Sequence, residues 1–301
     1  MTPLRLATRR SALAMAQSTL IAERLHEVTG RTVQLVPVVS EGDRNASSLR
    51  EIGGVGVFVA AVRAAVVSGD ADLAVHSLKD LPTAPHPDLI LAAVPTRADV
   101  RDAVVAREGG LADLPHGARV GTGAPRRAAQ LAQLRPDLTV VDIRGNVDTR
   151  IGYVEGGELA AVLLAMAGLQ RLGRADRATE VLSADQMMPA PGQGALAVEA
   201  RGDDRATVAA VAMLDDAPTR AAVTAERALL ARLEAGCTAP VGALATVVAD
   251  QIFLQGIVFG EDGSGGVRVA LAGAVTDPTA LGHAAAEQLL AGAEPLLGGT
   301  V

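Results

Sequence analysis

The sequence predicts an α/β protein of two lobes with mainly parallel sheets, followed by a small C-terminal α+β domain. Strand-like and helix-like segments alternate through the first two thirds of the 301 residues, as in parallel sheets covered by helices. The final third instead runs from a helix through two strands, a glycine-rich turn and another strand to a helix. A hydrophobic fraction of 49% provides for sizeable buried cores.

The first lobe begins with a short apolar strand, Leu4–Ala7. Apolar residues at a spacing of 3.6 predict a helix that follows Ser11 and extends to about Val28. We expect a strand of β-branched residues at 32–39, a helix at 57–67 that ends near Gly69, and another strand at 72–75.

The second lobe repeats this alternation. We expect strands at 119–121, 139–143 and 159–164, and helices at 125–135 and 146–155. Ligands of such folds bind beyond the carboxyl ends of the strands. Three segments are therefore candidate sites: 8–11, 76–80 and 143–150.

In the final third, acidic residues before a first-turn proline predict a helix that starts at 215–218 and extends to about Leu233. Glu226 lies within the apolar arc of this helix, where a charge is costly unless it is paired, whereas Arg227 points to another face. Strands at 241–248 and 252–259, a turn at 260–266, a further strand and a helix complete the chain.

Composition excludes several classes of protein. A single cysteine allows no internal disulfide, and five histidines without metal-binding spacing predict no metal. The net charge of −7 argues against a nucleic-acid binder. No apolar run approaches the roughly 20 residues that span a bilayer, and the N-terminus does not resemble a secretory signal. We therefore expect a cytoplasmic protein.

Lys79 is the only lysine among 27 basic residues. Together with Asp80 it follows an apolar strand, and a carboxylate beside a lysine at a strand end can act as a general acid or base. The alternative is an ordinary loop with a surface ion pair.

Arginines are dense between residues 119 and 177. Arg126 and Arg127 fall in a first helical turn, and Arg144 and Arg150 flank a strand-to-helix turn. Arginine at such places suits a carboxylate or phosphate, because its planar fork binds two oxygens at once. The alternative is solvated surface arginine.

Two glycine-flanked segments follow. In Gly192-Gln193-Gly194 the glycines permit close approach to a ligand, although a crossover between domains explains them equally well. A lone cysteine is usually a small buried apolar residue. Cys237, however, lies in the loop Ala235-Gly236-Cys237-Thr238, and a cysteine in a glycine-flanked loop is more often accessible and reactive.

Together, these segments resemble the hydroxymethylbilane synthase (porphobilinogen deaminase) family, in order from about residue 4 to 245. Its ATRxS, AVHSxKDxP, RGNxxTR, AxAGLxRL and PAxGQGA motifs match Ala7–Ser11, Ala74–Pro82, Arg144–Arg150, Ala165–Leu172 and Pro189–Ala195. Its cofactor-attachment region is similar to Thr224–Arg227 and Arg232–Cys237, with Ala235 where glycine is commoner.

The resemblance implies three domains of similar size. Two resemble the lobes of type II periplasmic binding proteins with a cleft between them, and the third carries the cofactor cysteine. We place the first at 1–96 and 193–215, on the side of the catalytic aspartate. The arginine-rich second domain is placed at 97–192 and the third at 216–301.

The resemblance also implies a reaction. Four porphobilinogen molecules are joined head to tail on a dipyrromethane primer that Cys237 holds as a thioether, without a metal. Ammonia and the linear tetrapyrrole hydroxymethylbilane are released, for porphyrin and haem biosynthesis. Asp80 would protonate the leaving amine, stabilise the azafulvene cation and take the pyrrole proton. Primer and substrates together carry twelve carboxylates, which explains why an acidic protein concentrates arginines.

By the same resemblance, further residues bind these acids. Lys79, Arg126, Arg127, Arg144 and Arg227 would bind the cofactor alongside Cys237, and the substrate would be bound by Arg9, Ser11, Arg150, Arg171 and Gln193. The sequence departs from the family at Glu51 and Val55, where many relatives have lysines, and at Gly123-Ala124-Pro125, where Ser-Ser-Leu is common. It also has Arg63, where relatives often carry other charges. We expect a monomer that binds neither nucleic acid nor membrane.

Two rival hypotheses remain. A non-catalytic solute-binding protein could share the two-lobe fold, since fold does not fix function; it predicts an export signal and no role for Cys237. An enzyme that uses Lys79 as a Schiff base is the other, and the neighbouring Asp80 argues against it.

Overall fold

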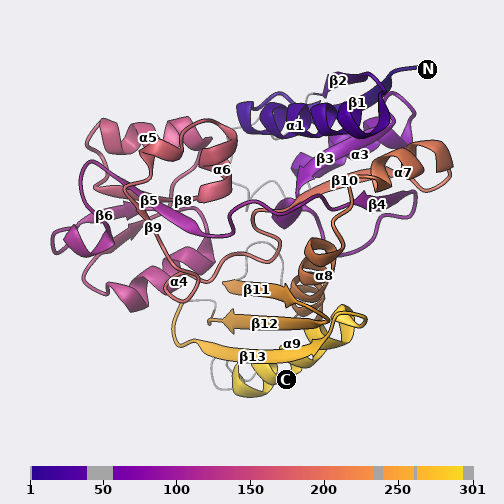
Figure 1. The fold of residues 1–301 in the computed structure, drawn as a ribbon. Coiled ribbons are helices and arrows are strands. Elements are labelled where there is room, and N and C mark those ends of the chain that lie inside the picture. The colour runs from indigo at the N-terminus through magenta and orange to yellow at the C-terminus, as the bar shows by residue number, and fades with distance from the viewer. Residues whose placement is uncertain (1, 39–56, 234–239, 261–262, 294–301) are drawn as a thin grey trace. The chain divides into compact units, whose positions relative to one another are not determined.

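The computed structural model describes residues 2–38, 57–233, 240–260 and 263–293 (Figure 1). The chain forms two compact units, which are described separately below. The first comprises Met1–Arg97 and Ala195–Arg220, and the second comprises Ala98–Gly194 and Ala221–Val301. A separate domain at 216–301 stays a prediction, because most of these residues belong to the same compact unit as Ala98–Gly194.

The first unit is built on a five-stranded sheet. Its strand order is β2-β1-β3-β10-β4, and only β10 runs antiparallel to its neighbours. The strands are β1 (Leu4–Arg9), β2 (Val33–Val38), β3 (Leu73–Ser77), β4 (Leu89–Ala93) and β10 (Leu196–Arg201). Its helices are α1 (Ala12–Thr29), α3 (Val57–Val67) and α7 (Arg205–Ala212).

Local sequence explains where these helices begin and end. The Ser11 side chain caps the start of α1, and Gly30 ends the helix in the left-handed conformation with φ 66°. Gly69, with φ 82°, follows the end of α3, as predicted. Leu6, Ile21, Leu73 and Val198 are fully buried between helices and sheet.

The second unit repeats this arrangement, with the strand order β7-β6-β8-β5-β9 and an antiparallel β5. Its strands are β5 (Asp102–Ala106), β6 (Arg119–Gly121), β7 (Thr139–Val141), β8 (Ala161–Ala165) and β9 (Glu180–Val181). Its helices are α4 (Pro125–Leu134), α5 (Val147–Glu155) and α6 (Met166–Arg171). The antiparallel strand β5 is the first strand after the chain enters the second unit, and β10 is the first strand after the chain returns to the first unit.

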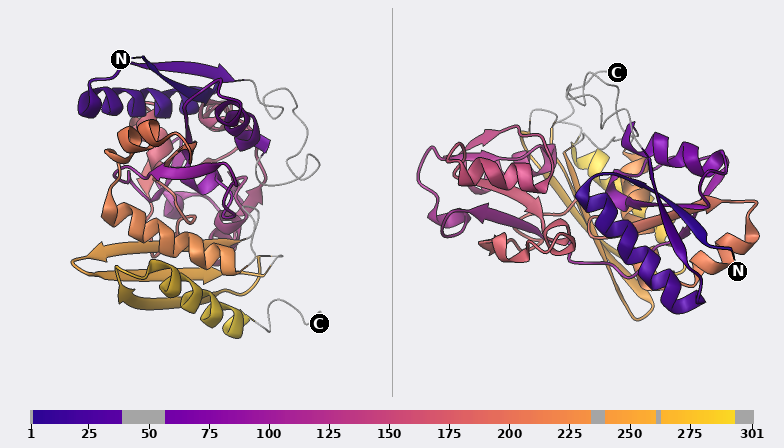
Figure 2. Two further views of the ribbon diagram at one scale, coloured as in Figure 1. Left: turned by 90° about the vertical axis from the view of Figure 1, so that its right-hand side faces the viewer. Right: turned by 90° about the horizontal axis from the view of Figure 1, so that it is seen from above.

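The rest of the second unit is an antiparallel sheet in the order β11-β12-β13, packed with two helices. The elements are β11 (Val241–Val248), β12 (Gln251–Val258), β13 (Val267–Ala274), α9 (Pro278–Ala293) and most of α8 (Ala217–Arg232). Figure 2 shows these elements from two further sides. The helices meet at Gly282, where a Cβ atom would lie 2.6 Å from the Ala228 Cβ.

The predicted α/β lobes and smaller α+β region are confirmed, with corrections of detail. Each main sheet contains one antiparallel strand, and the prediction omitted β4, β5, β9, β10, α6 and α7. The strand expected at 139–143 ends at Val141, and the one expected at 159–164 is Ala161–Ala165. No helix in the described part of the chain is long and apolar enough to span a membrane.

Candidate functional site

In the first unit, two neighbouring parallel strands end beside each other. β1 and β3 pair through Leu6 and Leu73, so their carboxyl ends reach the same edge of the sheet. Arg9 closes β1, and β3 is followed by a short 3-10 turn, Leu78–Asp80. Lys79 is half-buried on this turn and Asp80 is exposed.

Buried contacts fix this turn and the start of α1. Leu78 is fully buried, and its backbone N–H donates to the Ala195 carbonyl at 3.0 Å. The Gln17 side chain donates to the Ser77 hydroxyl at 2.8 Å, which joins α1 to the end of β3. Ser11 uses its hydroxyl to accept the Ala14 N–H at 3.4 Å. The Asp80 carboxylate is therefore carried on a well-anchored turn.

A buried ionic cluster lies in the same unit. Glu199 on β10 is 3% exposed, and Arg63 donates two hydrogen bonds of 2.8 Å to its carboxylate. The His76 Nε2 lies 3.3 Å from it, but without hydrogen-bond geometry. Burial alone would raise the pKa of Glu199, but His76 and Arg63 outweigh burial and lower that pKa to about 2.

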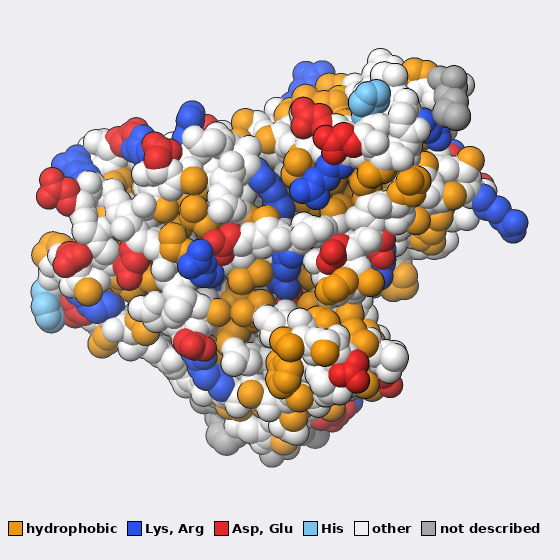
Figure 3. All heavy atoms as spheres, in the orientation of Figure 1, with side chains coloured by type: hydrophobic (Ala, Val, Ile, Leu, Met, Phe, Trp, Pro, Cys, Tyr) orange, Lys and Arg blue, Asp and Glu red, His pale blue; other side chains and the backbone are white. Residues whose placement is uncertain are grey.

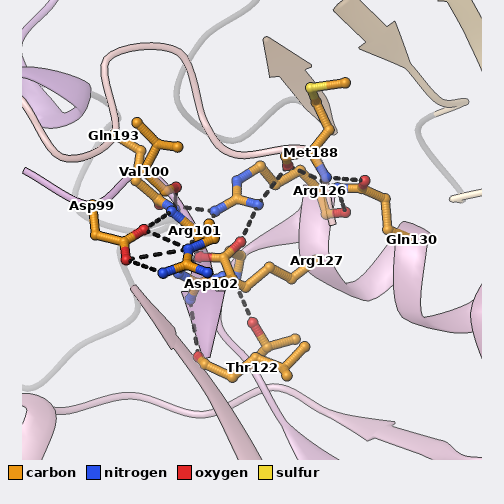
Figure 4. Close-up of polar contacts among 12 residues, drawn as sticks. Asp99, Val100, Arg101, Asp102, Thr122, Arg126, Arg127, Gln130, Met188 and Gln193 are labelled. Carbon is orange, nitrogen blue, oxygen red and sulfur yellow. Dashed lines mark hydrogen bonds and ion pairs between the residues drawn. The ribbon is translucent and has the colours of Figure 1, made fainter. Parts of the chain in front are cut away.

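In the second unit, one carboxylate holds two arginines (Figure 4). Asp102 begins β5 and is fully buried, and Arg126 and Arg127 in the first turn of α4 are each 4% exposed. Arg126 donates to the two carboxylate oxygens at 2.7 and 3.2 Å, and Arg127 donates at 2.7 Å. Pro125 at the start of α4 sets the direction of this turn.

The remaining contacts of the pair are also buried. Gln193 is fully buried; its amide nitrogen donates to Asp102 at 2.8 Å, and its amide oxygen accepts from Arg126 at 2.9 Å. Arg126 also donates to the Met188 carbonyl at 2.8 Å, and Arg127 to the Leu163 carbonyl at 2.9 Å.

The cluster of Arg126, Arg127 and Asp102 has more positive than negative charge. Burial alone would raise the pKa of Asp102, but the two arginine charges lower it far below its usual range. Burial lowers the pKa of Arg126, and Asp102 counters this effect while Arg127 adds to it. The Arg127 Nε is buried without a hydrogen-bond partner among the described residues. Such a site favours an additional anion.

Arg144 and Arg150 extend this positive region. Burial lowers the pKa of Arg150, and the charges of Arg127 and Arg144 lower it further, so the three guanidinium groups repel one another. The Arg150 Nε donates to the Gly145 carbonyl at 2.9 Å, and the Arg144 side chain is 47% exposed. A Cβ atom at Gly123 would lie 3.8 Å from a terminal nitrogen of Arg150. The segment Gly123–Pro125, where the family commonly has Ser-Ser-Leu, therefore borders this region.

Arg171 and Gly194 contact each other beside the cluster. The Arg171 guanidinium donates to the Gly194 carbonyl at 2.7 Å, and the Ala98 N–H donates to the same oxygen at 3.2 Å. Gly194 has φ 86°, and a Cβ there would lie 2.6 Å from the Ala98 carbonyl oxygen, so glycine is required. At the predicted crossover Gly192-Gln193-Gly194, the glycine at 194 thus permits close approach of the backbone to Ala98.

The structure therefore brings the predicted residues together in two groups, one in each unit. Arg9, Ser11, Lys79 and Asp80 lie in the first, and Arg126, Arg127, Arg144, Arg150, Arg171 and Gln193 lie in the second. Arg227 is half-buried on α8. Cys237, Glu51 and Val55 lie outside the described residues. The described residues contain no group of three or more metal-ligand side chains placed to hold a metal.

Sequence reasoning missed Asp102 and Glu199. Both are single acids within short apolar strands, Asp102–Ala106 and Leu196–Arg201. A buried acid in such a run needs a cationic partner, and this signal could have identified both residues.

The two α/β sheets and the arginine cluster define an α/β protein with a buried cationic site suited to an acidic ligand. Residues 4–209 match the family model "Porphobilinogen deaminase, dipyromethane cofactor binding domain", and residues 220–291 match "Porphobilinogen deaminase, C-terminal domain". The chain belongs to the porphobilinogen deaminase family. It is accordingly a transferase of tetrapyrrole biosynthesis with a dipyrromethane cofactor.

Curated relatives match over nearly the full length. "Porphobilinogen deaminase 1" of Streptomyces coelicolor is 57% identical, covering 98% of this chain and 97% of that protein. "Porphobilinogen deaminase" of Thermobifida fusca is 54% identical, with coverage of 96% and 93%.

Two similar solved structures share little sequence with this chain. A periplasmic substrate-binding protein of an ABC transporter from Coxiella burnetii has 11% identity and a TM-score of 0.45, covering 70% of this chain and 91% of that one. Immunogenic lipoprotein A from Vibrio vulnificus has 13% identity and a TM-score of 0.44, with coverage of 70% and 94%.

Proposed function

We propose that the chain condenses four porphobilinogen molecules, head to tail, on a dipyrromethane primer that is attached to Cys237, and releases ammonia and hydroxymethylbilane. The observation that carries this assignment is the buried pair of Arg126 and Arg127, which share the single carboxylate of Asp102. Porphobilinogen and the primer are both rich in carboxylates. A buried site with surplus positive charge fits such ligands and disfavours a neutral solute.

Within this site, we assign different roles to the two buried arginines. The two terminal nitrogens of Arg126 already bind Asp102, Met188 and Gln193, so we assign to Arg126 the orientation of the cluster. The Arg127 Nε is buried without a hydrogen-bond partner among the described residues, so we assign to Arg127 the direct contact with a ligand carboxylate. The cofactor supplies the pyrrole end on which the chain is built, and these residues would hold its acids.

The more exposed arginines suit the growing chain. Arg144 can rotate toward different carboxylates because its side chain is 47% exposed and its ion pair with Asp142, at 3.4 Å, is weak. Arg150 is held at Gly145 and experiences repulsion from its arginine neighbours, which an incoming carboxylate relieves. Arg171, through Gly194, maintains the adjoining backbone.

In the first unit, Asp80 is the proposed acid and base. It would donate a proton to the leaving amine of porphobilinogen and later accept the proton of the bonding pyrrole carbon. Its turn is anchored by Leu78, so the backbone that carries the carboxylate has a defined position. Arg9, Ser11 and Lys79 surround the same sheet edge and would bind substrate acids, as would Arg227 on α8.

Intact-mass spectrometry tests the assignment. The purified protein should carry an adduct of the mass of a dipyrromethane, and Cys237→Ser should lose that adduct. Added porphobilinogen should then give a ladder of heavier species in the wild type. An unmodified protein with full activity would disprove the assignment, and a borohydride-trapped adduct on Lys79 would transfer the covalent role to the lysine.

We also propose that the enzyme is a monomer of the cytoplasm that binds no nucleic acid. The net charge of −7 disfavours binding to nucleic acid. Light scattering on the purified protein should give the mass of one chain, 30.5 kDa. A mass of twice that value would refute the monomer.

A further inference from the structure

Glu226 is a fully buried carboxylate on α8 to which the proposed reaction assigns no role. Its Oε2 accepts the Gly192 N–H at 2.7 Å, and its Oε1 accepts the Ala245 N–H at 2.8 Å. A carboxylate removed from water is costly unless it is paired, and backbone N–H groups that point at it give strong, charge-assisted bonds. The sequence-based expectation that Glu226 must be paired is thereby confirmed.

The two bonds join three segments of the second unit. Glu226 comes from α8, Ala245 from β11, and Gly192 from the crossover turn, which we define as residues 189–194. β11 contacts the same turn independently, because the Ala243 N–H donates to the Pro189 carbonyl at 2.9 Å. The buried Glu226 carboxylate thus joins α8, β11 and the crossover turn.

The crossover turn also contacts the arginine cluster. Gly192, with φ 76°, is followed directly by Gln193, whose amide nitrogen donates to Asp102 at 2.8 Å. Asp102 in turn orients Arg127. Three hydrogen bonds and the peptide bond between Gly192 and Gln193 therefore connect the Glu226 carboxylate to Arg127, which we assign to a ligand acid.

α8 also precedes Cys237, the proposed attachment point of the primer, in the sequence. α8 ends at Arg232, and Cys237 follows five positions later in the sequence. A shift of α8 against the crossover turn would therefore move the end of the helix, at Arg232, relative to the arginine cluster.

We propose that Glu226 is a positioning residue that holds α8 and β11 in a fixed position against the crossover turn, and thereby keeps the arginine cluster in place. This proposal rests on the proposed function, because it takes the arginine cluster as the site that binds the acids of the primer and the growing chain. The proposal has a specific consequence. Loss of the Glu226 hydrogen bonds impairs the binding of the growing chain's carboxylates at successive steps, and this effect is larger than the loss of stability alone would cause.

Glu226→Gln tests this proposal with almost no change in side-chain size. The amide nitrogen cannot accept a hydrogen bond, so one of the two backbone N–H groups loses its partner. We expect the variant to carry the dipyrromethane mass but to accumulate species with one to three added pyrrole units. We expect kcat to fall about tenfold, as when one charge-assisted hydrogen bond is lost, with a smaller change in KM.

Leu289→Ala is the matched control, because Leu289 is fully buried in the same core, on α9, and has no part in the site. It should lower Tm at least as much as Glu226→Gln and yet give the wild-type pattern of intermediates at 25 °C. If both variants give the wild-type pattern per folded molecule, Glu226 is merely structural and the proposal is wrong.

Gly192→Ala is a second probe, in case Glu226→Gln does not fold. Its φ of 76° strains any residue with a Cβ atom, so the substitution displaces the crossover turn while leaving the Glu226 carboxylate intact. Stalled intermediates support the proposal, and a wild-type pattern overturns it. Failure of the proposed function itself would be recognised separately, as the absence of a dipyrromethane adduct on the wild-type protein.

Discussion

Replacement of Asp102 by asparagine should destabilise the protein strongly. The carboxylate accepts four hydrogen bonds, two from Arg126, one from Arg127 and one from Gln193. Asparagine keeps the shape but offers only one acceptor oxygen and no charge. Two buried guanidinium groups are then left without an anion. Removal of one partner from a buried ion pair typically costs about 3–5 kcal/mol, and we expect a loss of that size in the free energy of unfolding.

Urea unfolding followed by circular dichroism measures this loss. Asp142→Asn is the matched control, because Asp142 also pairs with an arginine but its side chain is 66% exposed; it should change stability by less than about 0.5 kcal/mol. A loss below about 1 kcal/mol for Asp102→Asn would refute the account of the cluster. The sign of the pH dependence follows as well. The pKa of Asp102 is lowered on folding, so its contribution is present above the unfolded-state pKa and is lost as the pH falls toward the folded value.

Further predictions concern both units. Asp80→Asn should fold normally but lose about 10²–10⁴-fold in turnover, the range of general acid–base catalysis; near-normal turnover would exclude Asp80 as the acid. Arg127→Leu should reduce cofactor content by mass more than Arg144→Leu does, because Arg144 is far more exposed; equal content would refute the assigned roles. Because the pKa of Glu199 falls to about 2, its ionised form should contribute about 3 kcal/mol of stability above pH 5, lost as the pH falls toward 2. Urea unfolding across this range should show a shallower pH dependence for Glu199→Gln than for the wild type.

The sequence predicted the parts of the fold that local rules determine. The start of α1 at Ser11, the end of α3 before Gly69 and the start of α8 after its acidic pair depend on nearby residues alone. Pairing between distant segments was not predictable in this way. β5 and β10 are short apolar runs, and only the completed sheets show that each lies between two strands that are remote in sequence.

The same distinction applies to the candidate site. Arg126 and Arg127 could be identified from their clustering at a helix start, and Asp80 from its place after a strand. That Arg126 is engaged by Asp102, Met188 and Gln193 could not be foreseen, because these partners lie 24, 62 and 67 positions away in the chain. Residues that support a site through buried hydrogen bonds become recognisable only when the fold brings them together.

The two buried acids show how a structural ion pair differs from a binding site. Each occupies the antiparallel strand of its sheet: Glu199 in β10 and Asp102 in β5. Glu199 binds the single guanidinium of Arg63, and the His76 Nε2 lies 3.3 Å from it, so this carboxylate faces one permanent positive charge and one imidazole. Asp102 binds two guanidinium groups, so one positive charge stays uncompensated in surroundings from which water is excluded. Because an uncompensated buried charge is costly, the second cluster is most stable with an anion from outside the protein, as a carboxylate-rich cofactor provides.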